Sequence, residues 1–188
     1  MKHNISILIL MLIFLSGCGD QGYDYYPKPQ GFMRLDFPER VYSDFSPDDC
    51  PYQFQVPAYF TTPEKEGCNK DLIMERFNAS LFLTYIPIDT NLIMNIEYAR
   101  KLVYEHSTMT DAIDEELIIN PAQNAYGLKY TIKGDAASPY QFYLTDSTNH
   151  FLRGALYFNV VPNYDSIRTS LVYLSEDIDN ILETIVWK

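Results

Sequence analysis

Asp146, Ser147 and His150 are the residue types that form the catalytic triad of serine hydrolases. In a triad the imidazole takes a proton from the serine on one side, while the acid holds the opposite side of the ring. The three residues lie within five positions of one another, and one turn does not easily provide that geometry. The sequence also has no Gly-x-Ser-x-Gly elbow. The spacing therefore favours a hydrogen-bonded turn over serine catalysis.

Two further sets of side chains could bind a metal ion. The first set is acidic and could offer oxygens to Ca²⁺: Asp111, Asp114, Glu115 and Glu116. It lacks the Asp-x-Asp-x-Asp-Gly spacing, so we expect a solvated acidic edge. The second set combines thiols and imidazoles: Cys50, Cys68, His106 and His150. It lacks the Cys-x₂-Cys and His-x₃-His spacings of zinc sites, and we therefore expect neither a metal nor another cofactor.

The first residues have the pattern of a bacterial lipoprotein signal. A basic start precedes an apolar run at residues 5–15, which only Ser6 interrupts and which is too short to span ~30 Å of hydrocarbon. The run ends in Leu15-Ser16-Gly17-Cys18, which resembles a lipobox, whose cysteine is diacylated on sulfur and receives an acyl chain such as palmitate on its amine. We predict a signal peptide at residues 1–17 and lipidation of Cys18. The alternative is an ordinary secretory signal with an accidental Cys18.

The net charge favours a covalent over an electrostatic attachment to the membrane. The formal value of -11 argues against nucleic acid as a partner, because such binding needs clustered Lys and Arg. It also disfavours adhesion to an anionic bilayer, so we expect the lipid on Cys18 to hold the protein at the membrane. Gly19 does not match the Asp-type signal for inner-membrane retention, and Asp20 and Asp24 do not form the dense acidic run of surface-exported lipoproteins. We therefore expect the outer membrane, facing the periplasm.

Cys50 and Cys68 remain once Cys18 is lipidated. An exported chain folds where disulfides persist, so we predict a bridge between them. The bridge would close a loop of 68 − 50 = 18 positions, which stabilises the fold by about 3 kcal/mol in the chain-entropy model.

The mature chain is predicted to be a tether followed by one domain. In residues 18–31, alternating prolines favour an extended polyproline-like spacer, and a ligand peptide for a partner is the alternative. Residues 32–188 are predicted to form a single globular domain, because their number lies within the range of one domain and aromatic residues make up 15% of the composition.

Aromatic and β-branched runs predict antiparallel strands in this domain. They lie at residues 32–37, 52–56, 81–86, 113–119 and 126–133, with a polar loop at 43–51. Residues 140–158 predict a β-hairpin, because two aromatic-rich runs flank the polar turn at 145–149. One face of its second run is wholly apolar: Leu152, Gly154, Leu156 and Phe158. Gly127 in the preceding strand is expected to admit a close approach of the backbone.

Two amphipathic helices complete the pattern. The first follows possible N-caps at residues 89–91, ends near His106 and carries one apolar stripe: Leu92, Ile93, Ile96, Ala99, Leu102 and Val103. The second, capped by Asp165 or Ser166, carries another: Ile167, Leu171, Leu174, Ile178, Ile181, Leu182 and Ile185. Each stripe must cover a sheet face. The expected fold class is α+β, with a mostly antiparallel sheet flanked by helices and the C-terminal helix packed on the sheet.

Arg153 lies on the otherwise apolar and aromatic side of the hairpin's second strand. An unpaired charge is costly to bury, so the side chain must either stack on tyrosines at the surface or pair with a carboxylate. Exposed Arg and Tyr side chains are favoured anchors at protein interfaces. We therefore predict Arg153, with Asp146, His150 and Tyr157, as candidate partner-binding residues.

Several segments carry a family resemblance. They include residues 26–31, Cys50-Pro51-Tyr52, Tyr126-Gly127-Leu128-Lys129-Tyr130 and the closing Trp187-Lys188, and the most specific is the hairpin string from Leu144 to Phe158. With these segments the chain resembles the gliding-motility lipoprotein GldD family of Bacteroidetes, although residues 67–78 depart from that pattern. The order of helices and strands is also similar to the Mog1/PsbP-like fold.

The resemblance implies an envelope lipoprotein needed for gliding, in a system linked to type IX secretion, with no known enzymatic activity. We therefore expect a non-catalytic accessory of the gliding and type IX secretion machinery that binds envelope proteins. The alternative function is an envelope hydrolase or a small-ligand-binding lipoprotein with a cleft near residues 146–153, which an open pocket there would favour.

Overall fold

The computed structural model describes residues 36–105 and 110–188. Phe37–Lys188 forms one compact unit. The predicted signal peptide, the tether and Cys18 lie outside the described residues, as do His106 and most of the strand predicted at 32–37. Asp36 and Phe37, the two residues of that stretch which are described, are not in a strand.

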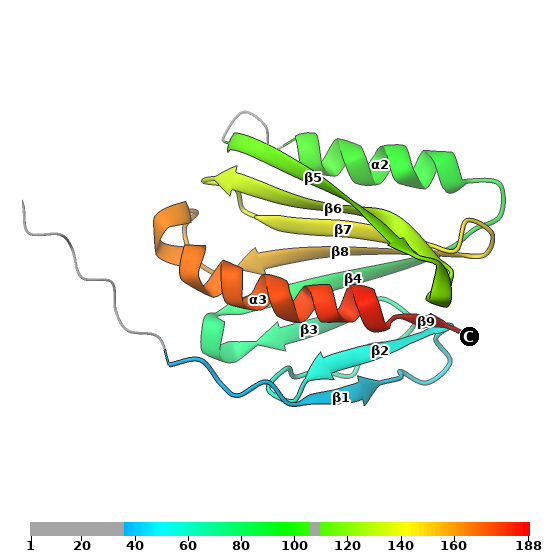
Figure 1. Cartoon of the computed structure of the whole chain (residues 1–188), viewed down its shortest axis with the longest axis horizontal. Coiled ribbons are helices and arrows are strands. Elements are labelled where there is room, and N and C mark those ends of the chain that lie inside the picture. Colours follow the sequence, from blue (N-terminus) through cyan, green and yellow to red (C-terminus); the bar gives the residue numbers. More distant parts are fainter. Residues whose placement is uncertain (1–35, 106–109) are drawn as a thin grey trace, which may run out of the picture. The chain divides into compact units, whose positions relative to one another are not determined.

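A six-stranded antiparallel sheet forms the middle layer of the unit (Figure 1). Its order is β3-β4-β8-β7-β6-β5. The strands are β3 (Lys70–Met74), β4 (Ala79–Pro87), β5 (Thr110–Asn120), β6 (Ala125–Gly134), β7 (Tyr140–Thr145) and β8 (His150–Phe158). The 3₁₀ turns η1 (Glu75–Phe77) and η3 (Pro121–Gln123) connect β3 to β4 and β5 to β6. With the two helices described below, this sheet confirms the predicted α+β class.

The predicted hairpin is confirmed, and it lies in the middle of the sheet. β7 pairs with β8 in a register that places Tyr140 opposite Leu156, and the leucines of β8 face the main core. The close approach expected at Gly127 is also confirmed. A Cβ at Gly127 would lie 1.9 Å from the carbonyl oxygen of Tyr143 on the neighbouring strand.

A second, three-stranded sheet lies beside the large one (Figure 1). Its order is β1-β2-β9, with β1 (Tyr42–Phe45), β2 (Tyr52–Pro57) and β9 (Val186–Trp187). The polar loop predicted at residues 43–51 is therefore wrong in its first part. β1 buries neither of its central residues, so its sequence has no alternating apolar signal, and the strand forms because it pairs with β2.

Helix α3 (Tyr164–Thr184) packs on one face of the large sheet and against β2. The whole predicted apolar stripe of this helix is buried: Ile167, Leu171, Leu174, Ile178, Ile181, Leu182 and Ile185. The predicted N-cap was wrong by two or three positions. Asn163 precedes the helix, and its side-chain oxygen accepts from the backbone N–H of Ser166 at 3.2 Å.

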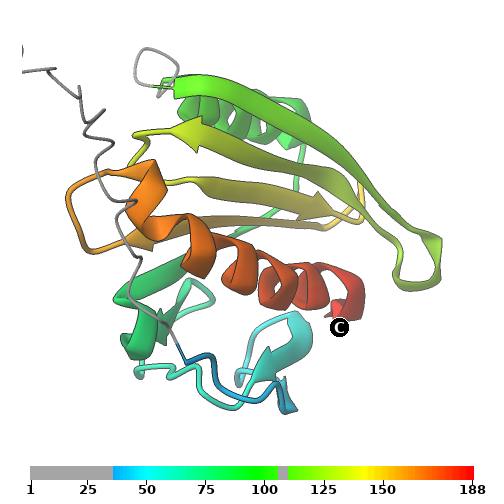
Figure 2. The same ribbon diagram turned by 60° about the vertical axis from the view of Figure 1, so that its left-hand side comes forward.

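Helix α2 (Leu92–Tyr104) lies on the opposite face of the same sheet, as Figure 2 shows. It contributes Ala99 and Val103 to a second, smaller core with Tyr143 and Phe151. Ile93, predicted in the buried stripe, is 77% exposed, because it lies about 100° around the helix from Leu92. Within the described residues, no helix is long and apolar enough to span a membrane.

Candidate partner-binding surface

Asp146 organises the turn of the central hairpin. Its Oδ1 accepts from the backbone N–H groups of Thr148, Asn149 and His150 at 3.0, 2.8 and 2.8 Å, and its Oδ2 accepts from Oγ1 of Thr148 at 2.9 Å. Burial alone would raise the pKa of Asp146, but the backbone hydrogen bonds outweigh it and hold that pKa below its ordinary value. The carboxylate is therefore ionised and occupied by its own turn.

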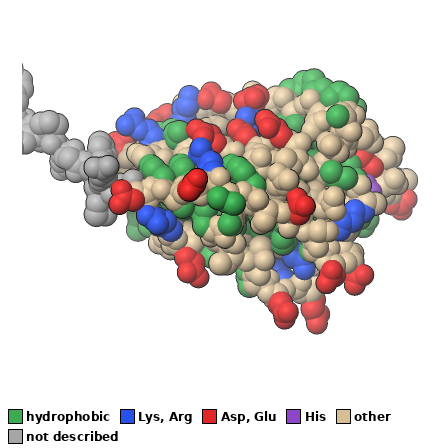
Figure 3. All heavy atoms as spheres, turned by 60° about the horizontal axis from the view of Figure 1, so that its bottom comes forward, with side chains coloured by type: hydrophobic (Ala, Val, Ile, Leu, Met, Phe, Trp, Pro, Cys, Tyr) green, Lys and Arg blue, Asp and Glu red, His purple; other side chains and the backbone are tan. Residues whose placement is uncertain are grey.

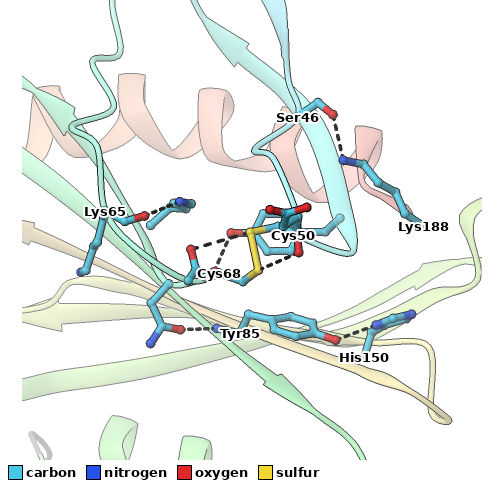
Figure 4. Close-up of a disulfide and its surroundings, with 12 residues drawn as sticks. Ser46, Cys50, Lys65, Cys68, Tyr85, His150 and Lys188 are labelled. Carbon is cyan, nitrogen blue, oxygen red and sulfur yellow. Dashed lines mark hydrogen bonds between the residues drawn. A yellow bond between two sulfur atoms is a disulfide. The ribbon is translucent and has the colours of Figure 1, made fainter.

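His150 is held by residues of other strands. Its Nδ1 shares a hydrogen bond of 2.8 Å with the hydroxyl of Tyr85 (Figure 4). Its ring stacks on Trp187 with 5.2 Å between centroids. Ser147 is exposed and has a φ of 68°, in the left-handed region that turns use. The imidazole thus has ring partners other than Ser147 and the carboxylate of Asp146. The predicted hydrogen-bonded turn is what the structure contains here.

A disulfide joins Cys50 to Cys68, with 5.3 Å between their Cα atoms (Figure 4). The hydroxyl of Tyr52 donates to the carbonyl oxygen of Cys68 at 2.7 Å. The bridge therefore ties the start of β2 to the segment that leads into β3.

Arg153 lies half-buried on the face of β8 that points to the α2 side of the sheet. Its Nη2 donates to Oε1 of Gln141, its diagonal neighbour on β7, at 2.6 Å. Burial lowers the pKa of Arg153, and the nearby phenol groups of Tyr157 and Tyr98 act in the opposite direction. Among the described residues no carboxylate pairs with this guanidinium. A neutral amide is the polar partner that the chain supplies.

Aromatic side chains surround Arg153 on the same face of the sheet. Tyr157 lies two positions further along β8, and its ring meets Phe82 of β4 edge-on at 5.6 Å between centroids. Phe82 is 39% exposed, and Tyr98 on the flank of α2 is 58% exposed. We call these five residues the Arg153 surface: Phe82, Tyr98, Gln141, Arg153 and Tyr157. It forms where α2 leaves the β4–β8 part of the sheet uncovered.

The four predicted binding candidates thus fall into two groups. The side chains of Asp146 and His150 are occupied within the chain, whereas Arg153 and Tyr157 lie together on one partly open face. None of the best-formed pockets of the described residues is lined by a residue of 146–153. One of these pockets, of about 650 Å³, is an open hollow beside Cys68. No observation therefore favours the alternative of a ligand cleft near the hairpin turn.

The acidic residues of β5 are partly neutralised by lysines of β6. Asp114 pairs with Lys133 at 2.6 Å, and Glu116 pairs with Lys129 at 3.2 Å. In the described ranges, no group of three or more His, Cys, Asp or Glu side chains is placed to hold a metal ion. Figure 3, which views the lower side of Figure 1, shows acidic side chains spread over that side with basic ones between them.

Asp177 is the centre of a polar network that sequence reasoning missed. This fully buried carboxylate of α3 accepts from Nε of Arg40 at 3.0 Å, from the hydroxyl of Tyr42 at 2.8 Å and from the hydroxyl of Tyr59. Burial and the bond to Asp177 raise the pKa of Tyr42 to about 12. The sequence held a sign of this network, because Asp177 is a charged residue on the apolar stripe of α3, beside Leu174 and Ile178.

Arg40 completes this network. Its Nη1 pairs with Glu176 at 2.7 Å, its Nη2 donates to the carbonyl oxygen of Tyr173 at 3.1 Å, and its guanidinium lies 4.2 Å from the centre of the Tyr173 ring. Burial alone would lower the pKa of Arg40, but Asp177 and Glu176 outweigh it and raise the pKa. The network fixes the first described segment of the chain to α3.

Known families, curated proteins and solved structures differ in how they match this chain. Curated proteins gave no match. Among solved structures, the chain is similar to the solution structure of cyanobacterial PsbP (CyanoP) from Synechocystis sp. PCC 6803, with 12% identity and a TM-score of 0.45, over 85% of this chain and 99% of that one. The family model described as gliding motility lipoprotein GldD matches residues 22–187. The chain therefore belongs to the gliding motility lipoprotein GldD family.

Proposed function

We propose that this lipoprotein is a non-catalytic accessory of the gliding machinery that binds an envelope partner protein through the Arg153 surface. In this proposal the lipid on Cys18 holds the protein on the periplasmic face of the outer membrane, and the partner belongs to the gliding and type IX secretion apparatus. One observation carries the proposal. A half-buried guanidinium, which no carboxylate of the described residues neutralises, lies among exposed aromatic side chains.

The composition of this surface supports binding over a purely structural role. Arg and Tyr are enriched among residues that contribute most to interface affinity, because they combine a large contact area with a polar end. Three of the five residues of the Arg153 surface are aromatic: Phe82, Tyr98 and Tyr157. Aromatic residues and Arg are enriched at protein interfaces relative to the rest of the surface.

Site-specific photo-cross-linking tests the proposal in the native envelope. A photoreactive residue replaces Phe82 in the full-length lipoprotein, and a matched variant carries it at Val172, an exposed residue of α3 (58%) on the other side of the sheet. We expect a discrete protein adduct from position 82 and none of the same mass from position 172. Gliding of the strain is measured in parallel.

Two results would contradict the proposal. If position 82 gives no protein adduct in cells that glide, the Arg153 surface is not the contact. If a deletion strain spreads and glides normally, the protein is not a required part of the machinery.

A further inference from the structure

Arg153 has unused hydrogen-bonding capacity. A guanidinium carries five N–H donors in a fixed planar fork. In the described residues one of its nitrogens, Nη2, donates to Gln141, and the partner atom there is a neutral amide oxygen. The chain therefore positions the guanidinium without cancelling its charge.

Gln141 has the properties of a positioning residue for Arg153. It is 1% exposed, so its orientation is fixed by packing, and its oxygen is directed to the guanidinium. Its amide nitrogen is buried and has no hydrogen-bond partner among the described residues. An amide that leaves a buried donor unpaired while its oxygen holds an arginine is uncommon in a region that serves stability alone.

The surroundings of Arg153 indicate which kind of anionic group can bind its free N–H donors. The phenol groups of Tyr98 and Tyr157 lie near the guanidinium, and Phe82 packs edge-on against Tyr157. The partial burial of Arg153 strengthens an ionic hydrogen bond there. A carboxylate matches the guanidinium fork in geometry and charge. A phosphate carries nearly two negative charges, and one arginine on a protein of net charge -11 does not balance them.

We infer that the Arg153 surface binds a carboxylate of the partner protein, from an Asp or Glu side chain or a C-terminus, together with an adjacent apolar residue that packs on Phe82 and Tyr157. This inference rests on the proposed function and gives the chemistry of its contact. Gln141 orients the guanidinium, and the carboxylate occupies donors that Gln141 leaves unused.

A zero-length cross-link tests the inference directly. The full-length variant Arg153→Lys places a primary amine near the site, and a carbodiimide condenses that amine with a carboxylate in contact to form an amide, while the carbodiimide takes up the water as a urea. We expect an adduct with the same partner that position 82 captures, and peptide mass spectrometry should map it to position 153 and to a carboxylate of the partner. Arg168→Lys, at an exposed arginine of α3, is the matched control and should give no such adduct.

A second variant measures how much the charge contributes. We expect Arg153→Met to lower the photo-cross-link yield from position 82 by at least about tenfold, as the loss of a charge-assisted pair at an interface predicts. Thermal denaturation of Arg153→Lys and Arg153→Met shows whether both variants fold. If either is unfolded, Gln141→Glu replaces it, because an internal carboxylate beside Arg153 should lower the same yield.

The outcomes separate the inference from the proposed function. An unchanged yield at position 82 in folded Arg153→Met or Gln141→Glu, or a partner adduct at position 153 that maps to no carboxylate, overturns the inference and leaves the proposed function standing. The inference is also overturned if Arg153→Met lowers the photo-cross-link yield at position 82 but Arg153→Lys gives no carbodiimide adduct at position 153. The arginine would then contact a group other than a carboxylate. Absence of every protein adduct at position 82 removes the proposed function itself.

Discussion

Arg40 and Arg153 are both partly buried arginines beside tyrosine side chains, but only the charge of Arg40 is neutralised by carboxylates of the described residues. Arg40 has two carboxylates, Asp177 and Glu176, and a carbonyl oxygen. Arg153 has one neutral amide. The electrostatic consequence is opposite, because the pKa of Arg40 is raised and that of Arg153 is lowered.

The comparison shows which charges are neutralised within the protein and which one remains available to a binding partner. On the α3 side, carboxylates, tyrosines and an arginine satisfy one another, and removing any member should affect stability. On the uncovered part of the α2 side, Arg153 is held in place but not neutralised, so its removal should affect binding more than stability. Four experiments test this contrast.

The largest effect is expected from Asp177→Asn. The substitution removes the buried carboxylate that accepts hydrogen bonds from Arg40, Tyr42 and Tyr59, and loss of one partner of a buried ion pair lowers the free energy of unfolding by about 3–5 kcal/mol. Chemical denaturation at neutral pH measures the loss. The control is Glu176→Gln, which removes the exposed partner of Arg40 and should change stability by about 0–1 kcal/mol. Equal effects of the two substitutions would contradict the central role of Asp177.

The disulfide between Cys50 and Cys68 should have the next largest effect. Its removal by the double substitution Cys50→Ser and Cys68→Ser should lower the free energy of unfolding by about 3 kcal/mol, because the reduced chain gains loop entropy. Mass measurement with and without reductant, after alkylation, first establishes the bridge in the purified protein. Two free thiols without reductant would refute it.

Asp146 offers a test within the same hairpin as Arg153. Because its folded-state pKa is depressed, its contribution is present above the ordinary value of 3.8 and is lost as the pH falls through the lower folded value. Asp146→Ala should lower the free energy of unfolding by about 1–2 kcal/mol at neutral pH, since three backbone N–H groups lose their acceptor. Urea titrations at neutral and strongly acidic pH should show this difference shrinking in acid. A difference that is constant with pH would mean that the ionised form of Asp146 is not what stabilises the turn.

Gln141→Glu would give Arg153 the internal carboxylate that Arg40 already has. The substitution removes an amide nitrogen that makes no hydrogen bond among the described residues. It also replaces the neutral hydrogen bond to Arg153 with an ionic one. We therefore expect the free energy of unfolding at neutral pH to rise by about 1 kcal/mol, since hydrogen bonds to charged groups are stronger than neutral ones. Gln141→Met, which has a similar length and no charge, is the control and should not stabilise. A loss of stability in Gln141→Glu would show that Arg153 is not available to a carboxylate.

The sequence predicted those elements whose signal is local. The central hairpin, the α3 stripe and the close approach at Gly127 each follow from residue type and spacing, and each is confirmed. β1 was missed because neither of its central residues is buried, so that its identity depends on pairing with β2. The cap of α3 was misplaced because Asn163, Asp165 and Ser166 are all good capping residues, and the path of the preceding loop decides between them.

The candidate site was predictable only in part. Arg153 could be singled out because a charge interrupts an apolar pattern, and the two alternatives considered were aromatic stacking and a carboxylate partner. The partner in the structure is Gln141, which reaches Arg153 diagonally across β7 and β8. Such a contact depends on strand register, which residue types alone do not specify. The Asp177 network likewise joins residues 118 to 137 positions apart in the chain.

The position of α3 also determines when this protein can finish folding. Its buried stripe packs on residues of both the large sheet and β2, while β9, which follows it, pairs with β2. Until residues 164–187 are free to dock, the main core lacks six of its buried side chains: Leu171, Leu174, Ile178, Ile181, Leu182 and Ile185. Strand pairing over such long sequence separations is slow. A chain that emerges from a translocation channel N-terminus first could therefore not complete its main core until residues 164–187 had crossed, and the apolar surface that α3 covers would need protection from aggregation until then.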